Sequence, residues 1–356
     1  MPKSRKYLKN LFRTEEAPVS RKGYLRLDMN ENPSGLPEDF IRKVFSEATP
    51  DMISRYPEYR GLIKKIANHN GLKPENICLS NGSDAAIKYL FEAYIAPGDK
   101  VLLTDPVFAM YPVYCKLFQA KPVFAKYESI SAFPIESFMR CLRGNIKMAV
   151  IVNPNNPTGS IIPKVQLLNI IKYCALHNIL LVIDEAYFYY YAGTAIKEVS
   201  RFSNLVILRT FSKLCAMASV RIGYAAADPG IINNLLKVRS SYDINGIGVF
   251  LAEKLLDSRR LIPVLVKKAD TGKAYLEEQL QKKCIEYNSG YANFLLINCG
   301  KRSDKIAAAL AKKRILVQGN FTPAFLNGFI RVTAGDKEEM QRFWMAFKDI
   351  WKGEDD

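Results

Sequence analysis

The sequence predicts an α/β protein with a mostly parallel sheet, followed by a smaller α+β part. Several short apolar runs are continuous rather than alternating, which indicates strands buried on both faces of a sheet. Helix-length segments separate these runs, as expected for parallel strands joined by crossover helices. After about residue 245 the pattern changes to a long charged helix followed by shorter strands and helices.

The first elements follow one another from the N-terminal side. Apolar residues at helical spacing predict a helix over 38–48, and a second helix is expected to stop at Gly71. A short strand, a glycine turn and a helix are predicted over 76–94. A further helix is predicted over 163–177. Four further strands are predicted at KVLLTDP (100–106), MAVIVNP (148–154), ILLVIDEAY (179–187) and NLVILRT (204–210).

The remaining elements form the smaller part. A charged helix is predicted over about 259–283, and short strands are predicted at NFLLINC (293–299) and GFIRVTA (328–334). One helix lies between these strands and another ends the chain. We therefore expect three regions: an N-terminal arm with part of the small domain over 1–44, a large domain over 45–245, and a small C-terminal domain over 246–356.

Composition argues against several classes of protein. The chain has two histidines and seven scattered cysteines without a C-x-x-C pair, so no metal site and no His-based catalytic triad are expected. No apolar run approaches the roughly 20 residues of a membrane span. The N-terminal segment also lacks the apolar region of a secretory signal. A cytoplasmic protein with reduced thiols is expected.

The formal net charge of +16 has two interpretations. Nucleic-acid binding is one of them. However, the lysines and arginines are spread along the chain, and no helix-turn-helix, zinc-finger or RRM signature is present. We favour a solvated cationic surface that attracts small anionic ligands, and expect neither a nucleic-acid nor a membrane partner.

Polar clusters follow the predicted strands at the edge where ligands bind in parallel sheets. Each cluster also has an ordinary structural explanation. Ser83 can cap a helix, the residues after 152 can form a simple turn, and Asp184 can cap the helix that follows its strand. Only the combination favours a functional site. The clusters are NGSD (81–84), NPNNPTG (153–159), DEAY (184–187) and RTFSK (209–213).

The combined residue types suit one cofactor, pyridoxal 5′-phosphate (PLP). Free backbone N–H groups at the helix that begins near Ser83 can bind a phosphate, and Arg221 can pair with the same group. Lys213, if desolvated, has a lowered pKa and can form a Schiff base. Asp184 supplies the acid that a pyridinium nitrogen needs. Lysine, acid and anion site are the three protein groups that PLP requires.

The sequence at this point resembles the fold-type I PLP enzymes, specifically the histidinol-phosphate aminotransferase-like branch. The resemblance covers nearly the whole chain and implies a large domain with a mostly parallel seven-stranded sheet flanked by helices, plus a small α+β domain. The motifs that carry it are LDMNENPSGLP (27–37), RYPEY (55–59), NGSDAAI, NPNNPTG, DEAY, TFSK with an arginine eight residues on, and GFIRVTAG (328–335).

The resemblance implies a role for each residue around the cofactor. Lys213 forms the aldimine with PLP and carries the proton, while Asp184 pairs with the ring nitrogen. The remaining roles are hydrogen bonds to the ring hydroxyl from Asn156 and Tyr187, stacking by Phe108, backbone N–H donation to the phosphate from Ser83 and Asp84, and further phosphate contacts from Thr210, Ser212 and Arg221.

Other implied roles concern the partner subunit and the substrate. Tyr56 reaches the phosphate of the neighbouring subunit, which implies a homodimer with shared active sites. Arg331 meets the anionic group of the substrate, with Asn32 and Gln318 as further substrate contacts. Two positions depart from the family: Ser34 replaces an aromatic residue after NENP, and Gln318 replaces an arginine. Both departures are expected at places that contact substrate.

The expected function is therefore an aminotransferase that acts on a small anionic, phosphorylated amine or amino acid. One alternative is a PLP-dependent amino-acid-phosphate decarboxylase of the threonine-phosphate or serine-phosphate type. Another is a true histidinol-phosphate aminotransferase. A basic nucleic-acid-binding protein is the alternative from a different class, and the ordered cofactor constellation argues against it.

Overall fold

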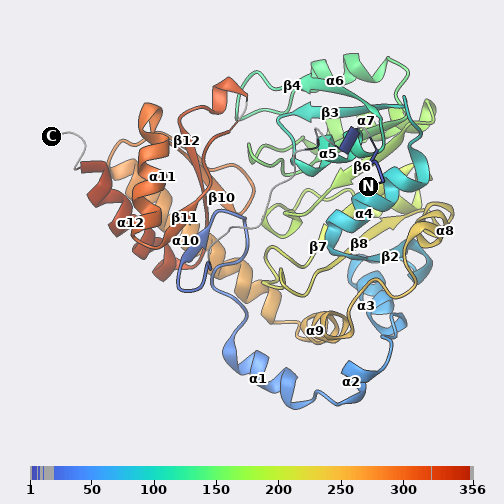
Figure 1. Cartoon of the computed structure of the whole chain (residues 1–356), viewed down its shortest axis with the longest axis horizontal. Helices are drawn as coiled ribbons and strands as arrows, with labels where there is room; N and C mark the ends of the chain where they lie inside the picture. The colour runs from blue at the N-terminus through green and yellow to red at the C-terminus, as the bar shows by residue number, and fades with distance from the viewer. Residues whose placement is uncertain (1, 6, 9–10, 12–19, 322, 353–356) are drawn as a thin grey trace.

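A seven-stranded sheet forms the centre of the larger part of the molecule (Figure 1). The structure is a computed structural model, and it describes residues 2–5, 7–8, 11, 20–321 and 323–352. The strand order is β2-β8-β7-β6-β5-β3-β4. β8 pairs antiparallel with both β2 and β7, and the other strand pairs of this sheet are parallel. The strands are β2 (Ile77–Asn81), β3 (Lys100–Asp105), β4 (Lys121–Lys126), β5 (Met148–Val152), β6 (Leu180–Asp184), β7 (Leu205–Thr210) and β8 (Ile222–Ala227).

Helices cover both faces of this sheet. On one face α3, α6, α7 and α9 form a single apolar cluster with the strands, and on the other face α4, α5 and α8 do so. The strands β5, β6, β7 and β8 are buried along their whole length, which explains their continuous apolar sequences. The helices are α3 (Arg60–Asn70), α4 (Gly82–Tyr94), α5 (Met110–Leu117), α6 (Ile135–Leu142), α7 (Lys164–Leu176), α8 (Pro229–Val238) and α9 (Gly246–Asp257).

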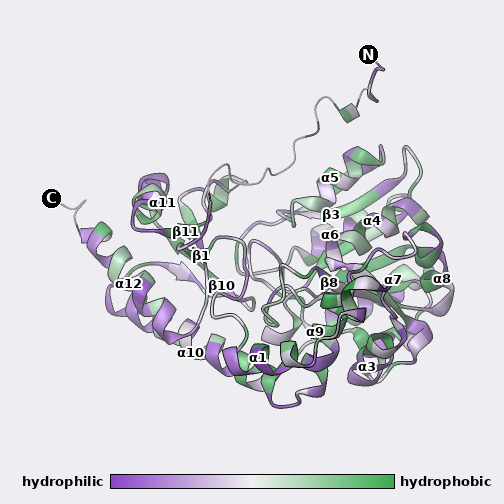
Figure 2. Cartoon of the chain, turned by 60° about the horizontal axis from the view of Figure 1, so that its bottom comes forward, coloured by the Kyte–Doolittle hydropathy of each residue, from purple (hydrophilic) through white to green (hydrophobic). Residues whose placement is uncertain are grey.

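The smaller part lies to the left in Figure 1 and has its own apolar cluster. Its sheets have the orders β12-β10-β9 and β1-β11. The outer faces of its long helices are largely hydrophilic, whereas the strands of the large sheet are hydrophobic (Figure 2). Its elements are α10 (Leu261–Lys282), α11 (Ser303–Lys312), α12 (Lys337–Lys352), β9 (Tyr287–Asn288), β10 (Phe294–Asn298), β11 (Ile315–Val317) and β12 (Phe329–Thr333).

The N-terminal segment joins both parts. β1 (Leu25–Leu27) pairs in parallel with β11, and the chain then passes through α1 (Glu38–Ser46) and α2 (Asp51–Ser54) to α3 (Figure 1). Gly71 ends α3 in the left-handed conformation, with φ of 66°, as the sequence predicts. In the described ranges, no helix is long and apolar enough to cross a membrane.

The long helix α10 belongs to both apolar clusters. Leu261, Leu265 and Ala269 pack with the cluster of the large sheet, whereas Leu276 and Leu280 pack with the smaller cluster. The preceding helix α9 packs on α3. We therefore propose that the boundary between the two domains lies within α10, later in the chain than residue 246.

The α/β class is confirmed, but the strands β4 and β8 carry no strong sequence signal. β4 lies at the edge of the sheet and exposes most of its residues, so it lacks a continuous apolar run. β8 has the sequence IGYAAA, which is rich in residues without β-propensity. Its Gly223 is required by packing, because a Cβ there would lie 2.4 Å from the backbone nitrogen of Ser83.

Candidate active site

A cavity of about 120 Å³ opens at the carboxyl ends of the parallel strands. Asn156 reaches it from the turn after β5, Asp184 from the end of β6, and Thr210 from the end of β7. The structure thus brings together every cofactor-binding residue expected from the sequence except Tyr56. The residues that line the cavity are Ser83, Asp84, Phe108, Val152, Asn156, Asp184, Ala186, Tyr187, Thr210, Ser212, Lys213 and Arg221.

Lys213 presents an amine whose proton is easily lost. Its Nζ donates a hydrogen bond to the backbone carbonyl of Met29 at 3.0 Å. Burial lowers the pKa of Lys213 to about 8, and the nearby Arg331 guanidinium adds to this effect. About a tenth of the Lys213 side chains is therefore neutral at pH 7 and able to act as nucleophile or base, far more than for a lysine with the ordinary pKa.

Asp184 is a buried carboxylate that faces the cavity. Its Oδ2 accepts a hydrogen bond from the Tyr111 hydroxyl at 3.0 Å, and its Oδ1 accepts one from the backbone N–H of Ala186 at 3.1 Å. Burial raises the pKa of Asp184 to about 6, although these two hydrogen bonds oppose the rise. Both donors are neutral, so a cation placed in the cavity would stabilise the ionised form.

An anion cradle lies where α4 begins. Gly82 has a φ of 72°, and a Cβ there would lie 2.2 Å from an Arg221 guanidinium nitrogen. Arg221 itself has a φ of 55°, and its Nη1 donates to Ser212 Oγ at 3.2 Å and to a backbone carbonyl at 3.0 Å. Both partners are neutral oxygens. The guanidinium and the free N–H groups of the helix N-terminus therefore face the same space, an arrangement that suits a phosphate.

Aromatic side chains form the walls of the cavity. Tyr187 is buried, and its ring packs edge-on against Phe294 with centroids 5.7 Å apart. Its hydroxyl accepts a hydrogen bond from Asn30 Nδ2 at 2.8 Å. Phe108 contacts Tyr111 edge-to-face at a centroid distance of 6.3 Å. Sequence reasoning did not single out Asn30, although it lies within the quoted NENP motif.

Arg331 is a buried cation beside the cavity, with 8% of its surface exposed. It donates to Asn156 Oδ1 at 2.6 Å and to the backbone carbonyl of Asp28 at 2.7 Å. The rings of Phe294 and Phe321 lie 5.4 and 5.7 Å from its guanidinium carbon. Its Nε is buried without a hydrogen-bond partner. Such a cation, bonded only to neutral oxygens, is well suited to a substrate anion.

The other two substrate contacts expected from the sequence, like Arg331, are not among the residues that line the cavity. Asn32 Nδ2 donates to the backbone carbonyl of Leu214 at 2.8 Å. Gln318 is exposed, and its side chain donates to the carbonyl of Gly319 at 2.9 Å. Its backbone pairs with that of Arg331, so it lies next to the buried cation. Position 318 is thus adjacent to Arg331 but carries no charge.

Ser34 faces a helix end rather than the cavity. Its hydroxyl donates to Glu339 Oε2 at 2.6 Å and accepts from the backbone N–H of Asp336 at 3.1 Å. Asp336 and Glu339 bond each other's backbone N–H groups at the start of α12, which is the arrangement of a capping box. In this structure Ser34 therefore links the N-terminal segment to α12.

Tyr56 lies outside the cavity of its own chain. It is 74% exposed and stacks on Tyr242, which is 57% exposed, with ring centroids 4.0 Å apart. Ile53, nearby in the chain, is 81% exposed. Two exposed large apolar side chains on one segment, one of them stacked on the exposed Tyr242 of another, are unusual for a surface that contacts only water.

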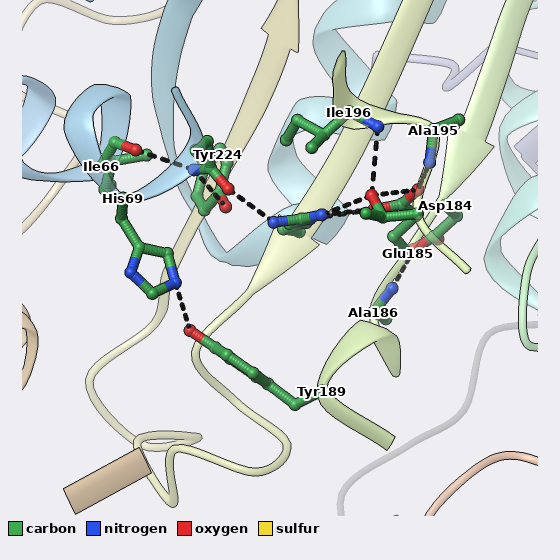
Figure 3. Close-up of polar contacts among 12 residues, drawn as sticks. Ile66, His69, Asp184, Glu185, Ala186, Tyr189, Ala195, Ile196 and Tyr224 are labelled. Atoms are coloured by element: carbon green, nitrogen blue, oxygen red, sulfur yellow. Dashed lines mark hydrogen bonds and ion pairs between the residues drawn. The ribbon is translucent and has the colours of Figure 1, made fainter. Parts of the chain in front are cut away.

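A buried ion pair between Arg209 and Glu185 was not foreseen from the sequence, and Glu185 is labelled beside Asp184 in Figure 3. Arg209 and Glu185 are 2% and 1% exposed, and both Nε and Nη2 of Arg209 donate to Glu185 Oε2, at 3.0 and 2.7 Å. Arg209 also donates to Asn70 Oδ1 and Thr194 Oγ1, each at 2.6 Å. The backbone N–H of Ala195 donates to Glu185 Oε1 at 2.7 Å.

This ion pair joins the two strands that carry the main site residues. Glu185 directly follows Asp184, and Arg209 directly precedes Thr210. Successive side chains of a strand point to opposite faces, so Asp184 and Thr210 face the cavity while Glu185 and Arg209 face away from it. Two charged residues beside two site residues on adjacent buried strands are the signal from which this pair could have been predicted.

Comparisons with known proteins identify the family. The model of the family described as aminotransferase class I and II matches residues 22–347. The chain belongs to this aminotransferase family. The aminotransferase is 31% identical over 328 residues to the histidinol-phosphate aminotransferase of Thermoanaerobacter sp. (strain X514), covering 91% of this chain and 92% of that protein. It is 30% identical over 343 residues to the protein of the same name from Caldanaerobacter subterraneus subsp. tengcongensis, covering 95% of each.

Solved structures share the fold of this aminotransferase. The histidinol-phosphate aminotransferase of Sinorhizobium meliloti, in complex with pyridoxal-5′-phosphate, has a TM-score of 0.86 at 21% identity and covers 99% of this chain and 98% of its own. The L-threonine-O-3-phosphate decarboxylase of Porphyromonas gingivalis has a TM-score of 0.78 at 16% identity. The match covers 92% of this chain and 99% of that chain. Because both names occur on one fold, the fold alone does not choose between the two reactions.

The enzyme is thus a PLP-dependent aminotransferase, and its cavity fits this cofactor. The cradle at Gly82 has no room for a Cβ and is lined by donors for a phosphate. Asp184 is a buried acid with neutral donors only, which suits a cationic ring nitrogen. Lys213 is an amine with a lowered pKa in the same cavity.

Proposed function

We propose that this aminotransferase takes the amino group from a small anionic, phosphorylated amine or amino acid. The observation that carries the proposal is that the buried cation Arg331 has the uncharged Gln318 as its neighbour on the adjacent backbone. One anionic group of modest size can bind Arg331 in a charge-assisted pair. A second cation at position 318, usual in the histidinol-phosphate branch, is absent.

PLP supplies an aldehyde that captures amines and a cationic ring that withdraws electrons from the bond being broken. We assign to Lys213 Nζ the removal of the proton from the substrate's amine-bearing carbon, because a pKa of about 8 makes its neutral form easier to reach near neutral pH than that of an ordinary lysine. The Asp184 carboxylate holds the ring nitrogen in its protonated form. Asn156 and Tyr187 orient the ring through its hydroxyl, and Phe108 covers one ring face.

The phosphate contacts follow from the cradle. We assign the backbone N–H groups of Ser83 and Asp84, the hydroxyls of Thr210 and Ser212, and the Arg221 guanidinium to the cofactor phosphate. Asp84 is held in place by the Tyr114 hydroxyl, which lies 3.2 Å from its Oδ1. A charged clamp of this kind fixes the register of the cofactor and hence the distance of its reactive carbon from Lys213.

Two other functions remain candidates, each with its own support. Histidinol phosphate is the substrate named for relatives that are 30% and 31% identical to this chain. Decarboxylation of an amino-acid phosphate shares the fold, as the Porphyromonas gingivalis structure illustrates. The half-reaction of the purified enzyme separates them, because transamination yields a keto product and decarboxylation yields carbon dioxide.

The first prediction concerns substrate choice. We expect a lower kcat/KM for histidinol phosphate than for phosphorylated three-carbon amines or phosphorylated hydroxyamino acids. A missing charge-assisted contact to a bound anion costs about 1.5–3 kcal/mol, or roughly ten- to a hundredfold in kcat/KM. The measurement is kcat/KM across this panel, with keto product and carbon dioxide followed together.

A substitution sharpens the same prediction. Gln318→Arg should raise kcat/KM for histidinol phosphate, whereas the similarly sized but uncharged Gln318→Met should not. If the unmodified enzyme already prefers histidinol phosphate by a wide margin, the interpretation of Gln318 is wrong and another basic residue replaces the missing arginine. Carbon dioxide release in place of a keto product would favour the decarboxylase.

The second prediction concerns assembly as a homodimer with shared sites. The exposed stack of Tyr56 on Tyr242 supports the proposal that Tyr56 reaches the phosphate of a partner subunit. Mixing Tyr56→Phe subunits with Lys213→Ala subunits should then restore part of the activity. Each heterodimer would contain one site with both defects and one site with neither.

Heterodimer formation is verified independently, by differently tagged subunits that copurify. Activity of the mixture is then compared with that of each variant alone. If heterodimers form and activity does not recover, Tyr56 does not act across the interface. A monomeric enzyme with full activity would overturn both the assembly and the role of Tyr56.

A further inference from the structure

The segment Asp28–Ser34, here called the strap, crosses the cavity between the two parts of the molecule. Its backbone and side chains form hydrogen bonds with residues that line the cavity and with a residue of the smaller sheet. Four hydrogen bonds tie it to the cavity and its surroundings: Arg331 Nη2 to the Asp28 carbonyl (2.7 Å), Lys213 Nζ to the Met29 carbonyl (3.0 Å), Asn30 Nδ2 to the Tyr187 hydroxyl (2.8 Å) and Asn32 Nδ2 to the Leu214 carbonyl (2.8 Å).

Asn30 is the most constrained residue of the strap. It is 1% exposed, and its φ of 55° lies in the left-handed region, which asparagine tolerates better than most residues. Its backbone N–H donates to Thr333 Oγ1 at 3.1 Å, and its backbone carbonyl accepts from Asn293 Nδ2 at 3.2 Å. Its side-chain Oδ1 lies 3.2 Å from Thr333 Oγ1. Two backbone contacts and one side-chain contact thus hold the residue, and its Nδ2 donates to Tyr187.

This contact determines what the Tyr187 hydroxyl can offer the cavity. A phenol has one proton and accepts through its lone pairs. Because Asn30 donates to the oxygen, the phenol proton remains available for an acceptor inside the cavity that Tyr187 lines. Burial raises the pKa of Tyr187, which keeps the proton on the phenol.

We propose that Asn30 is a positioning residue that directs the Tyr187 hydroxyl proton toward the ring oxygen of the bound cofactor. This inference rests on the proposed contact of Tyr187 with that ring oxygen. A hydrogen bond donated to an anionic oxygen stabilises the anionic form of that oxygen. A proton that the oxygen shares with a neighbouring atom is therefore lost more easily. Asn30 acts on the cofactor only through Tyr187.

The test uses Asn30→Asp, which keeps the shape of the side chain but removes its donor. A carboxylate at this place can only accept, so the Tyr187 proton turns toward it and away from the cofactor. The readout is the pH midpoint of the change in the cofactor's visible absorption. We expect Asn30→Asp to raise the midpoint by about one pH unit, the size of one lost charge-assisted hydrogen bond, and Tyr187→Phe to do the same.

Three further variants make the test specific. In the double variant Asn30→Asp/Tyr187→Phe the midpoint should equal that of Tyr187→Phe once the effect of the added charge is subtracted, because the two changes act through one hydroxyl. Asn32→Asp adds the same charge to the strap without contacting Tyr187, and its shift is subtracted as the effect of charge alone. Asn30→Gly keeps the left-handed backbone and adds neither charge nor acceptor; it should shift the midpoint in the same direction but by less, because the Tyr187 hydroxyl loses only the donor that orients it.

The outcomes distinguish this inference from the function on which it rests. Asn30→Asp is introduced both into the enzyme with Tyr187 and into the Tyr187→Phe variant. If it shifts the midpoint by the same amount in both, Asn30 does not act through Tyr187 and the inference fails. If Tyr187→Phe itself leaves the midpoint unchanged, the proposed contact of Tyr187 with the cofactor fails first. Asn30→Gly carries the test if Asn30→Asp does not fold, and an unshifted midpoint in that variant would then overturn the inference.

Discussion

Replacing Lys213 with alanine is expected to reduce turnover by at least about 10⁴-fold, because the proposed function gives this one side chain both the amine that holds PLP and the transfer of the proton. Lys213 is the only lysine among the residues that line the cavity. Its pKa of about 8 makes its neutral amine easier to reach than that of an ordinary lysine. The cradle around Arg221 is intact in this variant, so PLP still binds through its phosphate.

The measurement combines turnover, visible absorption and cofactor binding by the purified variant. Lys213→Ala should bind PLP without the absorption of the lysine-bound cofactor. Lys273→Ala is a suitable control, because Lys273 is also an amine whose pKa burial lowers, but it bonds the carbonyls of Gly290 and Ala292 away from the cavity. Normal turnover of Lys213→Ala would refute the site assignment.

Replacing Arg209 with methionine is expected to lower the free energy of unfolding by about 3–5 kcal/mol, the largest stability effect predicted here. The substitution leaves the Glu185 carboxylate buried without its cation. The hydrogen bonds that remain to it, from Thr194 and Ala195, are neutral and do not compensate a buried charge. Replacing both Glu185 and Arg209 with methionine should recover much of the loss, because no unpaired charge remains.

Urea unfolding of the PLP-loaded enzyme measures this effect. Arg201→Met is the matched control, since Arg201 pairs with Glu198 at 2.9 Å on the surface and its side chain is 65% exposed. Such pairs contribute about 0–1 kcal/mol. A loss for Arg209→Met no larger than that of the control would show that the buried pair contributes little to stability.

The cofactor cavity could be predicted from the sequence because its residues lie at the ends of apolar strands. Asn156, Asp184 and Lys213 each follow a continuous apolar run, and parallel strands place such ends at one edge. The edge strand β4 and the alanine-rich β8 could not be predicted in this way, because neither shows the apolar run of a buried strand. Their places depend on packing against neighbours, which local sequence does not report.

The contacts around the substrate side were less predictable, because they join segments far apart in the chain. Gln318 and Asn32 are held by backbone pairing and a carbonyl contact, and Ser34 is turned toward α12 by Glu339. Asn30 meets Tyr187 only when the strap crosses the cavity. No periodicity or spacing encodes such tertiary contacts, although the resemblance to a family pointed to the right region.

The pairing of β1 with β11 has a consequence for the order in which the protein is completed on the ribosome. Leu25 is made early but pairs with Ile315, which is made near the end. All residues that line the cavity, from Ser83 to Arg221, emerge before this partner strand. Long-range pairing is also slow, because a long loop must close before the contact forms. The large sheet and its cavity can therefore fold first. The strap then packs against a cavity that has already formed.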